Sequence, residues 1–305
     1  MRFSVWPNPD RPPREILQIV RACERLDWHA AYVADHFMPN GPGDAAVRGD
    51  VLEAMTTLAA LAASTSRIRL GTLVASATYR HPALAAKMFA TLDHVSDGRV
   101  IAGLGAGWQQ NEHASYGIEL GSVRERVDRF AEYVAVVHSM LSNDQTSFEG
   151  SFYRLADAPC DPRPVQDDVP ILLGVRGPRR TMAIAARYAS VWNAWSDPGS
   201  LAEMNAVLDG HCQAIDRDPA TLARSTQALL VLAEDEASLA EHRSSDGAPR
   251  AMIVGTPAEV VDIVAAYERA GCDELIVPCW TLGETPRAIE TLELFSQEVA
   301  RHFPG

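Results

Sequence analysis

Short apolar runs alternate along the chain with longer stretches in which apolar residues recur every three or four positions. The short runs predict buried strands, and the longer stretches predict helices with one apolar face. The predicted strands are residues 2–6, 30–34, 68–74, 100–104, 170–173, 189–192, 228–233 and 274–277. The predicted helices are residues 13–26, 52–64, 82–95, 123–141, 179–187, 201–215, 260–270 and 286–301.

Two segments interrupt this alternation. Residues 146–155 predict a β-hairpin that turns at Glu149 and Gly150, and the polar stretch 234–250 predicts an insertion or a mobile lid. Eight strands that are each followed by a helix close naturally into a parallel barrel. We therefore predict an α/β protein, a (β/α)8 TIM barrel with insertions after strands 4 and 7, in a single domain over residues 1–305.

An open doubly wound sheet is the other architecture that alternating strands and helices can form. That fold expects a glycine-rich GxGxxG turn after the first strand, where it holds a pyrophosphate. The turn in this chain reads WPNPDRPP, which has no glycine. The barrel is therefore the favoured prediction.

Composition narrows the classes of partner. The chain has 27 Lys and Arg against 40 Asp and Glu, a net charge of −13, which disfavours nucleic-acid and polybasic membrane binding. No stretch approaches the roughly 20 apolar residues of a membrane span, and the N-terminus lacks the apolar run of a signal peptide. The five cysteines show no metal-ligand spacing, so we expect free thiols, no metal site and a cytoplasmic location.

Candidate chemistry is sought where barrel strands end, because active sites of this fold lie at that face. Asp35 and His36 directly follow the second predicted strand. A histidine there can move a proton near neutral pH or stabilise a developing charge. The other interpretation is a loop histidine that caps a helix or bonds the backbone, and position alone leaves both open.

The ends of strands three and four are rich in small residues. After strand three the sequence is ASAT, including Ser76, which permits close approach of a flat ring or simply makes a tight turn. After strand four it is GLGAGWQQNEH, with Gly107, Trp108 and Asn111. Glycines there free the backbone for close ligand contact. The Glu112-His113 pair is either an acid–base pair or, as we favour from the sequence, a surface pair.

The end of strand five reads GVRGPRRT and runs directly into a predicted helix. Free N–H groups at a helix start, with glycines and arginines beside them, favour a phosphate site over an ordinary helix start.

Tryptophans provide a last group of candidates. Trp6, Trp192 and Trp195 are expected at the barrel mouth, and Trp28 and Trp280 in packing positions.

These strand ends together resemble the bacterial-luciferase-like superfamily of flavin and deazaflavin oxidoreductases, in particular its coenzyme F-420-dependent subgroup. The resemblance covers nearly the whole chain and is densest over residues 30–120. It is carried by AAYVADHF, RIRLGTLVASATYRHPALAAKMFATLDHVSDGRVIAGLGAGWQQNEHASYGI, VPILLGVRGPRRTMAIAARYASVWN and VGTPAEVVDIVAAYERAGCDELIV. It implies a (β/α)8 barrel and a homodimer.

The resemblance also implies roles for matched positions. Asp35 and His36 match a pair beside the cofactor's central ring, with His36 as proton acceptor or charge stabiliser and Asp35 orienting it or bonding the cofactor. Leu73 and Val74 match a cis-peptide platform, and Ser76 matches a residue at the ring's polar edge. A loop along the cofactor is matched by Gly107, Trp108 and Asn111. The phosphate segment is matched by Gly174, Val175, Arg176 and Gly177.

One position departs from the family pattern. Relatives that oxidise sugar phosphates carry a glutamate directly after the glycine matched by Gly107, where this chain has Trp108. The resemblance therefore implies hydride transfer between coenzyme F-420 and a small organic substrate other than a sugar phosphate. An FMN-dependent monooxygenase and a non-catalytic flavin-binding protein are the alternatives.

Overall fold

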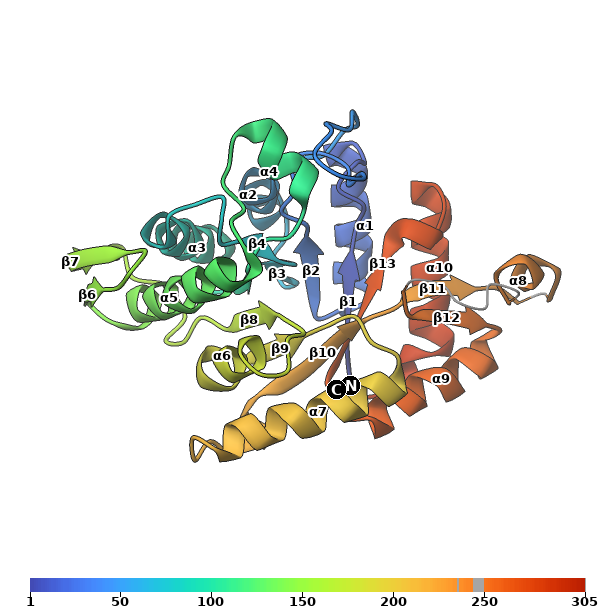
Figure 1. The fold of residues 1–305 in the computed structure, drawn as a ribbon. Coiled ribbons are helices and arrows are strands. Elements are labelled where there is room, and N and C mark those ends of the chain that lie inside the picture. Colours follow the sequence, from blue (N-terminus) through green and yellow to red (C-terminus); the bar gives the residue numbers. More distant parts are fainter. Residues whose placement is uncertain (235, 244–249, 305) are drawn as a thin grey trace.

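The computed structural model describes residues 1–234, 236–243 and 250–304. Parallel strands form one closed sheet, in the order β3-β2-β1-β13-β10-β9-β8-β5-β4, and pairing of β3 with β5 completes the circle (Figure 1). Its strands are β1 (Arg2–Trp6), β2 (Ala30–Val33), β3 (Arg69–Thr72), β4 (Ala75–Ser76), β5 (Val100–Gly105), β8 (Ile171–Gly174), β9 (Val191–Asn193), β10 (Ala223–Gln227) and β13 (Glu274–Pro278). The predicted (β/α)8 TIM barrel is confirmed.

Helices surround this sheet and cover its outer face (Figure 1). They are α1 (Pro13–Arg25), α2 (Ala54–Ser64), α3 (Pro82–Ser96), α5 (Val123–Ser142), α6 (Thr181–Tyr188), α7 (Pro198–Gln213), α9 (Pro257–Arg269) and α10 (Thr285–Glu298). Short 3₁₀ turns are η1 (Pro219–Thr221), η2 (Cys279–Thr281) and η3 (Ala300–His302). Helix starts follow the sequence signals: Ser122 with Glu125, and Thr256 with Glu259, each form a capping box.

Apart from β10, the strands are largely apolar because both of their faces are buried. Outward side chains such as Val5 and Leu173 pack with the helices in one large cluster. Inward side chains, among them Tyr32, Leu172 and Ile276, form a second cluster inside the barrel. The interior is therefore a packed core, and only the mouth at the carboxyl ends of the strands is left for a ligand.

The insertions lie where the sequence predicts them. After β5 come helix α4 (Gln110–Tyr116), α5 and the hairpin of β6 (Gln145–Glu149) and β7 (Arg154–Pro159). After β10 come β11 (Leu229–Leu232), α8 (Glu236–Arg243) and β12 (Met252–Gly255). The hairpin and α8 project on opposite sides of the barrel (Figure 1). Of the lid predicted over 234–250, residues 235 and 244–249 lie outside the described residues.

The seventh barrel strand was predicted wrongly. Residues 229–232 are a strand, but it leaves the barrel and pairs with β12. The barrel strand is β10, whose sequence is ARSTQ, and it pairs with β9 and β13. Four of its five residues are polar, and of these Gln227 lines the cavity while Arg224 pairs with Asp209, so the strand lacks the apolar run on which the prediction depended. Helix α4, which was predicted as loop, is the other difference.

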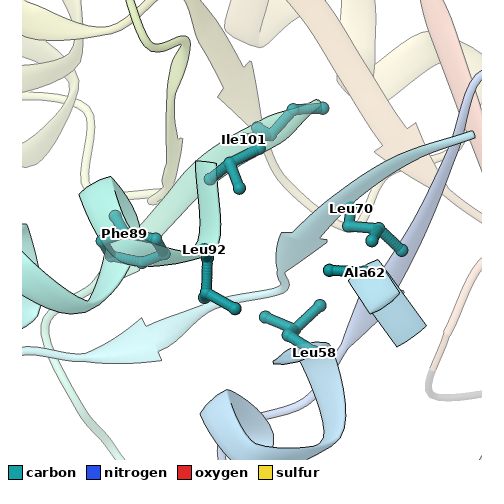
Figure 2. A pocket seen from close by; sticks show the side chains of 7 residues that line it. Leu58, Ala62, Leu70, Phe89, Leu92 and Ile101 are labelled. Atoms are coloured by element: carbon teal, nitrogen blue, oxygen red, sulfur yellow. The ribbon is translucent and has the colours of Figure 1, made fainter. Parts of the chain in front are cut away.

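A small apolar void lies between α2, α3 and the strands beneath them. Figure 2 shows Leu58 and Ala62 of α2 and Leu92 of α3 directed toward it, with Leu70 and Ile101 on the strands. The void has no room for a water molecule, and every labelled side chain is hydrocarbon. It is therefore a packing defect of the core and not a ligand site.

All five cysteines are buried free thiols, as the sequence predicts. Within the described ranges, no helix is long and apolar enough to cross a membrane. In the same part of the chain, no group of three or more His, Cys, Asp or Glu side chains has an arrangement suited to a metal ion.

Candidate active site

A cavity of about 890 Å³ opens at the carboxyl ends of the barrel strands. Its volume lies within the range of small-molecule and cofactor sites. One half of its wall comes from the segments that follow β2, β3, β5 and β8, including His36, Val74, Gly107 and Arg176. The other half comes from the ends of β1, β9, β10 and β13. The candidate residues from distant parts of the sequence are therefore brought to a single site.

His36 is held by a buried carboxylate. Its Nδ1 lies 2.8 Å from Oε1 of Glu112, and its side chain keeps 26% of its surface exposed. A carboxylate only accepts hydrogen bonds, so Nδ1 carries the proton and Nε2 of the neutral ring is a free acceptor. No described residue bonds Nε2. The ring of Trp108 contacts His36 edge-on, with centroids 5.6 Å apart.

Glu112 is fully buried on helix α4 and accepts three hydrogen bonds. Besides His36, the Tyr79 hydroxyl donates to Oε1 and the Phe37 amide donates to Oε2 at 2.9 Å. Burial raises the pKa of Glu112, but these bonds and the nearby imidazole outweigh it, so the pKa lies below its usual value. The carboxylate is therefore a stable anion that orients His36.

The sequence analysis judged Glu112 wrongly. It favoured a surface pair, whereas both Glu112 and His113 are buried. A sequence signal was available, because a glycine such as Gly117 commonly ends a helix; in the structure it ends α4 with φ 67°. Tyr79 was not singled out either, because nothing along the chain marks it as a neighbour of Glu112.

Asp35 does not orient His36. Its carboxylate pairs with Arg80 through two contacts of 2.6 and 3.0 Å and accepts a bond of 2.9 Å from the Ser76 amide. Asp35 and His36 bond different partners: Asp35 bonds Arg80 and the Ser76 amide, and His36 bonds Glu112. The expected orienting role belongs to Glu112. Asp35 instead joins the end of β2 to β4 and Arg80, which keeps this wall of the cavity in place.

The peptide bond between Leu73 and Val74 is cis, and both residues line the cavity. Val74 fits against two glycines. A Cβ atom on Gly105 would lie 2.4 Å from Cγ2 of Val74, and one on Gly174 would lie 2.9 Å from Cγ1. These glycines let the apolar platform of residues 73 and 74 lie flat against β5 and β8.

A chain of hydroxyl groups lies beside the platform. The Ser76 hydroxyl is 2.7 Å from that of Thr78, which is 2.7 Å from Nε2 of His113. His113 donates from Nδ1 to the Gln109 carbonyl at 2.6 Å. Gly107, at φ 84°, covers the hydroxyl pair, and a Cβ there would lie 2.8 Å from the Ser76 oxygen. Ser76 and Gly107 both line the cavity.

Trp108 lies at the cavity, whereas Asn111 does not. Trp108 is 56% exposed and stands at the cavity rim beside His36. Asn111 is fully buried and outside the cavity lining, where its amide donates to the Pro39 carbonyl at 3.0 Å. Direct contact between Asn111 and a cofactor is therefore not supported. Asn111 anchors the loop after β2 because α4 turns its side chain away from the cavity.

The predicted phosphate segment follows β8 and leads into α6. Gly174, Val175, Arg176 and Gly177 line the cavity, together with Thr181. Val175 donates its amide to Asn193, whereas the amides of Arg176 and Gly177 bond no described residue. These two N–H groups, with the Arg176 side chain, are the anion-binding groups that this edge of the cavity offers.

Three tryptophans lie on the opposite wall. Trp6 and Trp195 line the cavity as predicted, and Trp280 joins them, contrary to its predicted packing role. Trp192, predicted at the mouth, is instead fully buried in the outer core and donates to the Val175 carbonyl at 2.8 Å. The reason is the alternation along β9 and the residues after it, which directs Trp192 outward toward the helices.

The barrel with this cavity at its mouth defines a TIM-barrel protein with a ligand site in the usual place for that fold. The profile of the luciferase-like monooxygenase family matches residues 1–247. The chain belongs to that family, as the sequence resemblance implied.

Two curated relatives carry more specific names. An F420-dependent hydroxymycolic acid dehydrogenase from Mycobacterium tuberculosis is 32% identical over 72% of this chain and 59% of its own length. An F420-dependent glucose-6-phosphate dehydrogenase from Amycolatopsis mediterranei is 34% identical over 58% of this chain and 50% of its own length. The chain thus spans about half to three-fifths of these relatives.

Solved structures support the fold over the full length. The F420-dependent tetrahydromethanopterin reductase from Methanopyrus kandleri has a TM-score of 0.84 at 20% identity and covers 99% of both chains. A monooxygenase from Streptomyces bottropensis has a TM-score of 0.79 at 20% identity and covers 100% of both. At such identities the likeness concerns the barrel alone, which both kinds of enzyme share.

Proposed function

We propose that this protein is an oxidoreductase that transfers a hydride between coenzyme F-420 and a small organic substrate. One observation carries the proposal: a free Nε2 of His36, oriented by Glu112, faces a cavity beside the Leu73–Val74 platform. The names of the curated relatives point to the same cofactor.

The residues present fit a deazaflavin. The cavity volume suffices for a three-ring system, and glycines at positions 105, 107 and 174 leave the backbone approachable where side chains would fill the space. Leu73, Val74 and Ser76 would support the ring, and Gly107 and Trp108 would lie along it. Gly174, Val175, Arg176 and Gly177 would hold the phosphate with their amides and guanidinium. When bound, the deazaflavin supplies or accepts two electrons as a hydride.

The protein's own chemical contribution is the handling of a proton. Nε2 of His36 accepts a proton from a substrate hydroxyl when the substrate is oxidised, or returns it when a carbonyl is reduced. The anionic Glu112 stabilises the imidazolium that forms during this transfer. Asp35 takes no part in the proton transfer, because Arg80 and the Ser76 amide occupy its oxygens.

The substrate is not a sugar phosphate under this proposal. Trp108 occupies the position of the glutamate of sugar-phosphate-oxidising relatives, and its exposed ring narrows the mouth beside His36. The homodimer, the cytoplasmic location and the single-domain assignment stay predictions.

Equilibrium binding of coenzyme F-420 and of FMN to the purified apoprotein tests the proposal. We expect F-420 to bind with the lower Kd, measured by the change in its fluorescence. Preference for FMN together with substrate-linked oxygen consumption would instead identify an FMN monooxygenase. Binding of either cofactor with no turnover of any alcohol or carbonyl compound would indicate a flavin-binding protein.

A further inference from the structure

The wall of the cavity opposite the Leu73–Val74 platform is aromatic. Trp6 ends β1, Trp195 follows β9 and Trp280 lies in η2 after β13. Their ring centroids are 5.0 Å apart for Trp6 and Trp280, 5.7 Å for Trp195 and Trp280, and 6.1 Å for Trp6 and Trp195. Three mutually contacting indoles make one continuous surface, which favours a flat apolar ligand. The proposed cofactor residues all lie on the other half of the cavity.

A cation that pairs with no carboxylate of the described residues borders this aromatic wall. The guanidinium carbon of Arg250 lies 4.9 Å from the ring centroid of Trp280 and 5.3 Å from that of Trp195. Cation–π contact holds it over the wall. Among the described residues it has no carboxylate partner, although the chain is strongly acidic and the buried carboxylates of the cavity, Asp35 and Glu112, are both paired. Arg250 can therefore bind an anionic group of a ligand.

Polar atoms on the same wall are buried without a partner. They are Nε1 of Trp6 and Oε1 of Gln227, whose residues are 7% and 3% exposed, and Oδ1 of the less buried Asn8. A buried polar group without a hydrogen bond is costly, so such groups mark places where a ligand supplies the bond. The indole only donates and the amide oxygen only accepts. A hydroxyl group satisfies both kinds of partner.

We propose that Trp6, Trp195, Trp280, Gln227 and Arg250 form the substrate subsite, and that the substrate is a flat apolar carboxylic acid that also carries a hydroxyl group. The flat body packs against the indoles beside Arg250, and the carboxylate pairs with Arg250. This hydroxyl bonds the unpartnered groups of Trp6 and Gln227 and is not the group that exchanges a proton with His36. That this ligand is the substrate rests on the proposed function. Its binding does not, because the subsite would bind such an acid in the apoprotein as well.

Calorimetric titration of the apoprotein with 6-hydroxy-2-naphthoate tests the subsite. We expect it to bind at least tenfold more tightly than its uncharged carboxamide and more tightly than 2-naphthoate, which lacks the hydroxyl. Arg250→Gln should abolish the difference between acid and carboxamide and change carboxamide affinity less than twofold. Arg250 is exposed, so the variant should fold. Arg124→Gln, at a surface arginine outside the cavity, is the matched control and should bind as the wild type does.

Other outcomes would overturn the subsite. Equal affinity for acid and carboxamide in the wild type, or an unchanged preference in Arg250→Gln, excludes Arg250 as the carboxylate partner. Unchanged affinity in a folded Trp280→Leu variant excludes the aromatic wall. F-420 titration of the same protein separates the two proposals. Arg250-dependent naphthoate binding without F-420 binding retains the subsite and rejects the proposed function, and F-420 binding without naphthoate binding does the reverse.

Discussion

Two glutamates at opposite ends of the barrel are equally buried, but their pKa values are shifted in opposite directions. Glu112 at the mouth and Glu274 at the start of β13 both have no exposed surface. Glu112 accepts bonds from an imidazole, a phenol and a backbone amide, and its pKa is lowered. Glu274 accepts from the hydroxyls of Ser4 at 2.6 Å and Tyr32 at 3.0 Å, and its second oxygen has no partner. Burial raises the pKa of Glu274, and its hydrogen bonds do not offset this.

The comparison shows that the partners of a buried carboxylate, and not its burial alone, decide the direction in which its pKa is shifted. At the mouth, three donors keep Glu112 ionised, so it can orient His36 and balance its charge. At the closed end, burial outweighs the bonds from two hydroxyls and the nearby Arg2 and Arg69, so the pKa of Glu274 is raised. The mouth thus holds the carboxylate that orients a reactive side chain, and the closed end holds a structural one, which agrees with the general division of this fold.

The largest effect on turnover is expected for His36→Asn, which removes the imidazole that Glu112 orients. Turnover should fall by about 10²–10⁴-fold, the usual contribution of a proton-transferring side chain. The Kd for F-420 should change little, because asparagine keeps a polar group of similar reach. The measurements are the rate of deazaflavin absorbance change and a cofactor titration, with His302→Asn outside the cavity as control. Unchanged turnover with unchanged Kd would exclude a proton-handling role for His36.

Glu112→Gln should have the next largest effect, because it removes the anion and turns one accepting oxygen into a donor. We expect kcat to fall about 10–100-fold with KM nearly unchanged, as for loss of a group that orients a catalytic histidine. The pKa of Glu112 is lowered in the fold, so its stabilising effect is present above the pKa of the unfolded chain and is lost as pH falls. Urea unfolding should therefore show the variant less stable at pH 7, with the difference shrinking toward pH 4.

Glu274→Gln should have the smallest effect and the opposite sign. The pKa of Glu274 is raised in the fold, so its favourable contribution is complete below the pKa of the unfolded chain and is lost as pH rises. Glutamine has no charge to bury and can still accept from Ser4 and Tyr32. At pH 8 the variant should be more stable to urea by about 1 kcal/mol, with turnover unchanged. A variant less stable at pH 8 than at pH 4, relative to wild type, would contradict the raised pKa of Glu274.

Much of the fold was predictable, because its signals are local. Seven of the eight barrel strands lie where apolar runs predict them, and α9 begins at the capping box that Thr256 and Glu259 form. Strand β10 was not predictable from apolar runs, since four of its five residues are polar and one of them, Gln227, lines the cavity. The candidate site was predictable as far as the strand ends: His36, Ser76, Gly107 and Arg176 all line one cavity.

The sequence by itself determined the barrel, the positions of its insertions and the set of strand ends that meet at the mouth, because periodicity and helix caps act over a few residues. Only the tertiary structure decided which side chains pair across that mouth. His36 and Glu112 are 76 positions apart in the chain, and Trp6, Trp195 and Trp280 come from three different strand ends. Such contacts depend on how the strands close into a circle and on which way each side chain points, and no local pattern encodes either.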